Sequence, residues 1–137
     1  MDFEGAKVAL FLGQKLAVIQ RDDFVGLPFA GFWDLPGGGR ESSETPFECV
    51  ARECKEELGL RLAPSDVVWS RRFVSTTTGI GTAWYFVAHL PEAAVGRVVF
   101  GDEGQRWALI TPDAFLAHPK AVPAFQERLQ LYLAENK

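Results

Sequence analysis

The sequence has few cysteines and no long apolar run, and both shortages exclude classes of protein. Its two cysteines, Cys49 and Cys54, have no second pair with which to form a disulfide framework or a zinc site. No segment approaches the roughly 20 apolar residues that a membrane-spanning helix needs. The N-terminus also lacks the basic stretch and apolar stretch of a secretory signal. We therefore expect a cytoplasmic protein with reduced thiols and no membrane partner.

Positive charge is also scarce. The 14 lysines and arginines are outnumbered by 18 aspartates and glutamates, which gives a net charge of −4. Proteins that hold nucleic acids by their phosphates carry a basic excess, so general nucleic-acid binding is not expected. A length of 137 residues suits one hydrophobic core, and no repeat or low-complexity linker divides it. The sequence predicts a single domain over residues 1–137.

Segments rich in β-branched and aromatic residues, bounded by turn residues, predict strands. These strands span residues 7–12, 16–21, 32–35, 67–75, 82–90, 97–100 and 105–110. Helical periodicity predicts helices over Pro46–Leu58 and residues 123–134. Residues 116–121 are predicted to be a connection, and residues 37–39 a flexible glycine loop. This order of elements predicts an α+β fold in which helices pack in layers on a mixed sheet.

The first predicted helix carries recognisable signals at both ends. Thr45 is placed as its N-cap, Pro46 occupies the first helical position, and Glu48 stands where a capping box needs an acid. Gly59 provides the C-terminal stop. These local signals define the helix more sharply than any other element.

Three glutamates of this helix, Glu53, Glu56 and Glu57, lie at spacings of three and four residues, so their side chains are neighbours. Helical periodicity places them opposite an apolar stripe made of Phe47, Val50, Ala51, Cys54 and Leu58. Each like-charge pair costs a few tenths of a kcal/mol on an exposed helix. A solvated helix face would explain the glutamates alone. A bound cation would offset their repulsion, and ligands that are all oxygen favour Mg²⁺ or Mn²⁺ over zinc.

Three consecutive glycines, Gly37, Gly38 and Gly39, precede the acidic helix. Glycine leaves the backbone bare, so amides and carbonyls can approach a phosphate or an ion closely. Acids on a helix beside a glycine segment are the parts of a site for a metal-bound pyrophosphate. The pattern therefore favours a metal site over a solvated face.

These residues match a known family motif. Gly38, five residues, Glu44, seven residues and then the run RECKEELGL resemble the complete Nudix box, with Cys54 in its aliphatic position. The preceding run WDLPGG is also similar to the family's approach to the box. The resemblance implies the Nudix fold, an α/β/α sandwich with a mixed sheet. It also implies hydrolysis of a nucleoside diphosphate linked to another moiety.

The resemblance also implies a role for each residue of the box. Glu53, Glu56 and Glu57 would bind Mg²⁺, for which Mn²⁺ can substitute, and the carbonyl of Gly37 would be a further ligand. Arg52 would orient the acids by pairing with a glutamate such as Glu44, while Gly59 has a structural role.

The general base is left open between an acid of the box, Glu53 or Glu56, and an acid on a distant loop. Glu103 is the distant candidate, because the run DEGQ resembles the loop that supplies an additional metal-binding glutamate in MutT-like proteins. Its glycine neighbours, Gly101 and Gly104, are equally typical of an exposed turn.

The substrate is less well defined by the sequence. Gly38 and Gly39, with the cations Arg40 and Arg21, are expected to hold phosphates, although both arginines could also be plain surface charges. The run KAVP before the last helix has no asparagine, which argues against strict specificity for oxidised guanine. A nucleoside triphosphate or similar small nucleotide is the expected substrate.

Four alternatives remain beside that expectation. A Nudix-fold module could bind a nucleotide without cleaving it, although the intact box favours hydrolysis. A dinucleotide, a nucleotide sugar or a capped RNA end could also be the substrate. The sequence leaves the oligomeric state open and is compatible with a homodimer.

Overall fold

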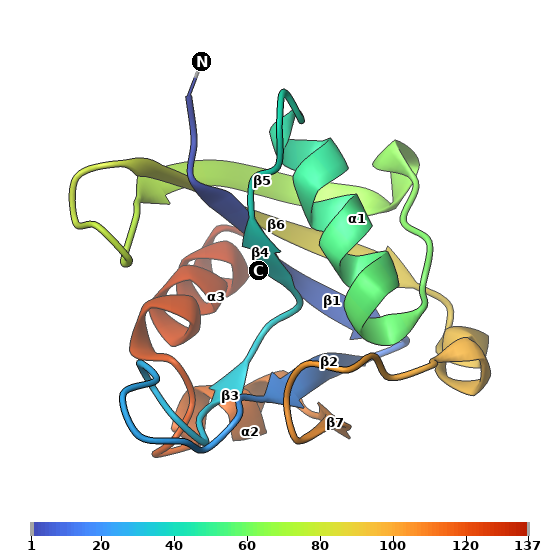
Figure 1. Cartoon of the computed structure of the whole chain (residues 1–137). Coiled ribbons are helices and arrows are strands. Elements are labelled where there is room, and N and C mark those ends of the chain that lie inside the picture. Colours follow the sequence, from blue (N-terminus) through green and yellow to red (C-terminus); the bar gives the residue numbers. More distant parts are fainter. Residues whose placement is uncertain (1, 137) are drawn as a thin grey trace.

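The structure is a computed structural model and describes residues 2–136. A mixed sheet of seven strands forms its centre (Figure 1). The strands are β1 (Gly5–Leu12), β2 (Lys15–Gln20), β3 (Trp33–Asp34), β4 (Gly37–Gly39), β5 (Val67–Val74), β6 (Thr82–Leu90) and β7 (Arg106–Ile110). The helices are α1 (Pro46–Leu58), α2 (Pro112–Ala117) and α3 (Pro123–Glu135), with short 3₁₀ turns at η1 (Pro64–Asp66) and η2 (Glu92–Arg97).

The strand order places β1 in the middle of the sheet. The main path runs β3-β2-β1-β6-β5, while β4 pairs with β1 and β7 pairs with β2. β1 and β6 run parallel, and the other pairs are antiparallel. The central strand therefore lies next to β4, the short glycine strand that precedes α1.

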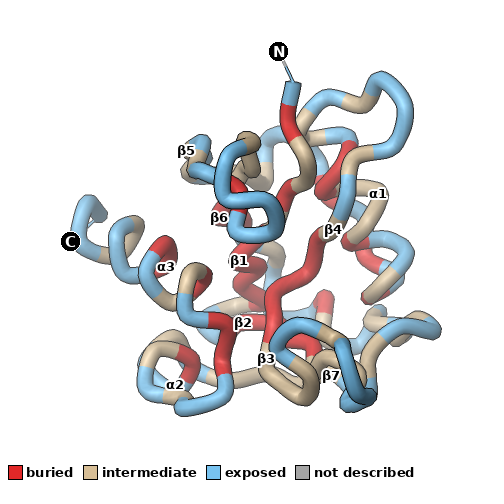
Figure 2. The backbone as a smooth tube through the Cα atoms, turned by 60° about the vertical axis from the view of Figure 1, so that its left-hand side comes forward, coloured by how far each residue is buried: buried red, intermediate tan, exposed pale blue. Residues whose placement is uncertain are grey.

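Helices cover both faces of this sheet (Figure 1). Alternate residues of β1 point to opposite faces: Val8 and Leu10 belong to the core beneath α1, and Ala9 and Phe11 to the core beneath α2 and α3. Figure 2 shows buried positions concentrated along the central strands and the inner sides of the helices. The expected α/β/α sandwich with a mixed sheet is confirmed.

The ends of α1 lie where the capping signals place them. The hydroxyl of Thr45 accepts from the Glu48 amide (3.2 Å), and the Glu48 carboxylate accepts from the Thr45 amide (2.9 Å). Gly59 closes the helix in the left-handed conformation (φ 68°). An N-cap of this kind contributes about 1 kcal/mol. The caps thus fix which residues of α1 face the glycine strand.

Two predicted elements differ in the structure, and one helix is additional. Residues 37–39 are a strand rather than a flexible loop, because they pair with β1. Residues 97–100 are not a strand, because the amide of Val99 donates to the carbonyl of Leu58 (2.9 Å) at the end of α1. The short helix α2 was not predicted, although Thr111 caps it by accepting from Ala114 (3.1 Å).

The helices in the described residues 2–136 are all too short or too polar to span a membrane.

Candidate active site

The glycine strand β4 lies between the central strand and the acidic helix, and two of its glycines have no room for a side chain. A Cβ on Gly37, whose φ is 139°, would collide with the carbonyl of Ala6 on β1. A Cβ on Gly38 would collide with the carboxylate of Glu53. Glycine is therefore required at position 37 for β4 to contact β1, whereas a side chain at position 38 would displace the carboxylate of Glu53.

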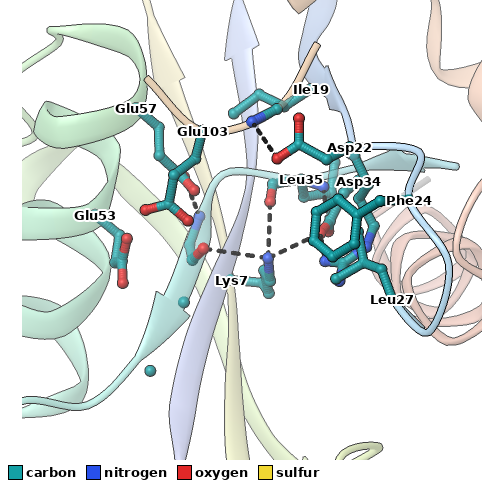
Figure 3. A pocket seen from close by; sticks show the side chains of 15 residues that line it. Lys7, Ile19, Asp22, Phe24, Leu27, Asp34, Leu35, Glu53, Glu57 and Glu103 are labelled. Carbon is teal, nitrogen blue, oxygen red and sulfur yellow. Dashed lines mark hydrogen bonds and ion pairs between the residues drawn. The ribbon is translucent and has the colours of Figure 1, made fainter. Parts of the chain in front are cut away.

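A cavity of about 350 Å³ opens beside this strand (Figure 3). Its acidic side is formed by Glu53 and Glu57 from α1 and Glu103 from the loop before β7. Its other side carries the cations Lys7 and Arg21. The remaining lining residues are Ile19, Asp22, Phe24, Leu27, Asp34, Leu35, Gly37, Gly38, Gly39 and Gly104. The acids of α1 and of the loop before β7 thus lie across the cavity from Lys7 and Arg21, whose side also carries Asp22 and Asp34.

Glu57 lines this cavity and does not belong to a solvent-facing stripe of α1. This corrects the prediction that Glu57 lies opposite the apolar stripe of the helix. Its carboxylate accepts from the Gly37 amide (2.8 Å). Burial raises the pKa of Glu57 to about 7, and the positive charge of Lys7 and the Gly37 hydrogen bond only partly oppose this rise. The side of α1 between its apolar stripe and its exposed face packs on β4, which explains the burial.

Glu53 shares this environment. Burial raises the pKa of Glu53, Arg52 opposes the rise and the neighbouring charge of Glu56 adds to it. Two carboxylates that resist ionisation are therefore held side by side on one helix, where a cation would stabilise their charged forms.

Arg52 makes the predicted pair with Glu44, and it also links α1 to the glycine strand. Its guanidinium donates to the Glu44 carboxylate (2.7 Å) and to the Gly39 carbonyl (2.8 Å). It also pairs with Glu56 (3.2 Å), whose side chain is 54% exposed and lies outside the cavity. Of the three box glutamates, Glu53 and Glu57 line the cavity and Glu56 does not.

The donor set of the cavity fits a hard divalent cation. Glu53, Glu57 and Glu103 offer only carboxylate oxygens, which Mg²⁺ and Mn²⁺ prefer. Within residues 2–136, however, no three acidic, histidine or cysteine side chains are close enough together to hold an ion without rearranging. The carbonyl of Gly37, the other expected ligand, accepts from Lys7 (3.2 Å). An ion would have to draw these oxygens together.

Glu103 reaches the cavity because its loop is tied down at both ends. The Gly101 amide donates to the carbonyl of Glu57 (2.9 Å), and the Gln105 amide donates to the carbonyl of Gln20 (2.8 Å). A Cβ on Gly101 would collide with the carbonyl of Glu56. Gly101, two residues before Glu103, thus allows close packing on α1. The Glu103 carboxylate faces the cavity acids although it remains exposed.

Three charged residues of the cavity, Lys7, Asp22 and Asp34, were not found from the sequence. Asp34 is only 5% exposed and accepts from Lys7 (3.1 Å) and Arg21 (3.0 Å). A lysine inside the apolar run of β1 was the available signal. Arg21 lines the cavity as expected. Arg40 does not, because it stacks on Phe3 (4.6 Å) and donates to the Glu44 carbonyl (3.0 Å).

Gly38→Ala should reduce activity much more than stability. The new methyl group meets the flexible end of Glu53, which can move. The expected loss of turnover is about 10²-fold, because the carboxylate of Glu53 would be displaced by roughly 1 Å. Steady-state kinetics and thermal melting measure the two effects. Gly96→Ala is the control, since its Cβ enters open space. Equal turnover for Gly38→Ala and wild type would contradict a role for this close contact.

Comparisons with known proteins agree with the fold and the motif. Residues 3–131 match the NUDIX domain family. A MutT-like protein from Streptomyces ambofaciens is 35% identical over 101 residues, which cover 74% of this chain and 57% of that protein. The chain therefore spans little more than half the length of that relative.

Two solved structures share the fold. The MutT protein from Methanosarcina mazei Go1 has a TM-score of 0.76 at 22% identity, covering 100% of this chain and 99% of that one. A bifunctional NMN adenylyltransferase/ADP ribose pyrophosphatase from Francisella tularensis, complexed with AMP and a Mn ion, has a TM-score of 0.75 at 15% identity. The match covers 98% of this chain and 42% of that one.

The chain belongs to the Nudix family, and its resemblance to the MutT-like Nudix hydrolases is confirmed.

Proposed function

We propose that this protein is a Mg²⁺-dependent Nudix pyrophosphohydrolase that cleaves a nucleoside triphosphate or a similar small nucleotide. The observation that carries the proposal is the cavity in which Glu53, Glu57 and Glu103 face Lys7 and Arg21 across the glycine strand. An anionic pyrophosphate has cations to attract it, and the carboxylates supply the ligands for the cation that the family implies. The proposal also includes a single domain and a cytoplasmic location for the protein.

We propose a different role for each charged residue of the site. Glu53 and Glu57 would hold Mg²⁺ or Mn²⁺, which neutralises phosphate charge and acidifies a water molecule. Glu56 joins them only when its ion pair with Arg52 opens. Lys7 and Arg21 attract the phosphates, while Arg52 keeps α1 in register with β4.

The reaction consumes one water molecule. Its oxygen forms a bond to phosphorus while the anhydride P–O bond breaks on the opposite side, and the leaving phosphate group takes the bonding electrons. Glu103 or Glu53 accepts the proton of the water, since both carboxylates border the same cavity.

Binding without hydrolysis is the main alternative function. The Francisella protein, which shares this fold over 42% of its chain, is complexed with AMP and a Mn ion. The intact Nudix box argues for hydrolysis. Dinucleotides and nucleotide sugars remain candidate substrates of the same chemistry.

A panel of nucleotides tests the proposal. Nucleoside triphosphates, a dinucleoside polyphosphate, a nucleotide sugar and a capped RNA end are incubated with the protein and Mg²⁺, and chromatography resolves the products. We expect at least one nucleotide to yield a nucleoside monophosphate. Tight nucleotide binding with every compound left intact would contradict hydrolysis and support a binding module.

A further inference from the structure

Lys7 lies where the acidic side of the cavity meets its cationic side (Figure 3). The pairing of β1 with β4 places Lys7 directly opposite Gly37. A Cβ on Gly37 would lie only 2.9 Å from the Cδ of Lys7, so the glycine leaves room for the lysine side chain to pass. The ammonium group therefore reaches the cavity from a strand whose other side chains are apolar.

Every N–H donor of Lys7 has an acceptor within the folded chain. The ammonium donates to the Asp34 carboxylate (3.1 Å), the Leu35 carbonyl (3.2 Å) and the Gly37 carbonyl (3.2 Å). An ammonium group has three N–H groups, and these three contacts use them all. A phosphate in the cavity can therefore receive a hydrogen bond from Lys7 only after one of the contacts opens.

The contact with the Gly37 carbonyl is the one that a bound cation would break. This carbonyl is an expected ligand, and the amide of the same residue donates to Glu57 (2.8 Å), which keeps Gly37 beside the acids of α1. A cation such as Mg²⁺ lies about 2.1 Å from an oxygen ligand, so on this carbonyl it would be no more than about 5 Å from the Lys7 ammonium. Two positive charges at that separation repel each other in a partly buried site.

Asp34 would keep Lys7 at the cavity when the Gly37 contact opens. Its carboxylate is only 5% exposed and pairs with Lys7 (3.1 Å) and with Arg21 (3.0 Å). Removing a partner from a buried ion pair is costly, because a charge is left uncompensated. Lys7 thus has one acceptor that a cation would displace and another that would hold the side chain in place. Opening the first contact leaves one N–H group free to turn toward the cavity.

We propose that Lys7 couples the divalent cation to the phosphates of the nucleotide. A cation that binds the Gly37 carbonyl displaces one N–H group of Lys7, and this N–H group then donates to a phosphate oxygen in the cavity. Cation binding thereby raises the affinity for the nucleotide, and by linkage the nucleotide raises the affinity for the cation. The inference rests on the proposed function, because it concerns the cation and the phosphates of that site.

The first test measures Mn²⁺ affinity in the absence of nucleotide, from the signal of free Mn²⁺ in electron paramagnetic resonance. Lys7→Met should bind Mn²⁺ about 10-fold more tightly than wild type, because the ion no longer has to break a hydrogen bond from a charged donor. Lys7→Gln is also uncharged and should bind Mn²⁺ more tightly as well. Circular dichroism verifies that each variant is folded, and the glutamine variant decides the matter if the methionine variant is not.

The second test measures the coupling itself. Calorimetric titration gives the affinity for α,β-methylene-ATP, whose bridge between the first two phosphates resists hydrolysis, with saturating Mn²⁺ and without it. The ratio of the two affinities is the coupling factor. It should be at least about 5-fold smaller in Lys7→Met than in wild type, because the variant has no N–H group for the cation to release.

Arg21→Met is the matched control. Arg21 is a second cation of the cavity and also pairs with Asp34, but its other hydrogen bond goes to the carbonyl of Pro28 (3.0 Å). Within residues 2–136 it makes no hydrogen bond to Gly37. The variant should therefore keep an Mn²⁺ affinity close to that of wild type. It should weaken analogue binding by similar factors with and without Mn²⁺, which leaves the coupling factor unchanged.

Three results would overturn the inference. The first is equal Mn²⁺ affinity in wild type and the folded Lys7 variants, and the second is an unchanged coupling factor in those variants. The third is an equal gain in Mn²⁺ affinity in Arg21→Met, which would make Lys7 a charge that acts only at a distance. Because binding is measured without hydrolysis, a coupling that Lys7→Met reduces in a protein that cleaves no nucleotide would contradict only the proposed function. Absence of Mn²⁺ binding in wild type and Lys7→Met alike would contradict both.

Discussion

Glu57→Gln should lower turnover by about 10²–10³-fold, as the loss of one preorganised electrostatic group does in other enzymes. The substitution keeps the shape of the side chain and an oxygen that can still accept from the Gly37 amide. It removes the charge with which Glu57 would hold the cation beside Glu53. Steady-state kinetics at saturating Mg²⁺ measure the effect.

The same variant should be more stable than wild type in metal-free buffer at pH 8. The folded pKa of Glu57 is about 7, above the ordinary value of 4.5, so the folded protein binds more protons than the unfolded chain between these two values. Stability of the wild type should therefore fall as the pH rises from about 4.5 to about 7, by up to about 3 kcal/mol. Glutamine does not ionise, so Glu57→Gln should not lose stability in this way. The difference in melting temperature between the variant and wild type should therefore appear between about pH 4.5 and about pH 7 and persist above it.

Glu56→Gln provides the contrast. Its carboxylate is exposed and paired with Arg52, so its removal should bring no gain in stability. As a proposed ligand it should still lower turnover. Near wild-type turnover in either variant would refute that residue's role as a ligand, and unfolding of both would make the acids structural.

Glu103→Gln should also lower turnover, and the way it does so identifies its role. A lost metal ligand weakens Mg²⁺ affinity, so raising the metal concentration should partly restore the rate by mass action. A lost general base should leave Mg²⁺ affinity unchanged, depress turnover by roughly 10²–10⁴-fold and recover in part at higher pH. Mg²⁺ titrations and pH–rate profiles of the variant beside wild type separate the two.

Unchanged turnover of Glu103→Gln under both conditions would contradict either role. The general base would then lie in the box, with Glu53 the better placed candidate because it lines the cavity. Asp102→Asn is the matched control, since Asp102 is an exposed acid on the same loop and is not part of the cavity wall.

Local chemistry explains which parts of the structure were predictable. Both ends of α1 were placed correctly because Thr45, Pro46 and Gly59 act on the adjacent backbone. The pairing of Arg52 with Glu44 was implied by the motif and is present. Such contacts need no knowledge of distant segments.

Long-range contacts explain the errors. Periodicity separated the acids of α1 from its apolar stripe, but only the pairing of β4 with β1 shows that Glu57 is covered. Residues 97–100 have the composition of a strand, yet the last carbonyls of α1 accept hydrogen bonds from the amides of Val99 and Gly101. Lys7 and Asp34 are 27 positions apart, and no pattern in the sequence connects them.

The central claim is that the acids of this cavity and a divalent cation together cleave a nucleotide anhydride. The most direct test incubates the best nucleoside triphosphate of the panel with wild type and Glu57→Gln, each with Mg²⁺ and with EDTA, and resolves the products by chromatography. The account predicts nucleoside monophosphate and pyrophosphate from wild type with Mg²⁺ alone. Cleavage that persists in EDTA, or that proceeds equally fast in Glu57→Gln, would contradict it.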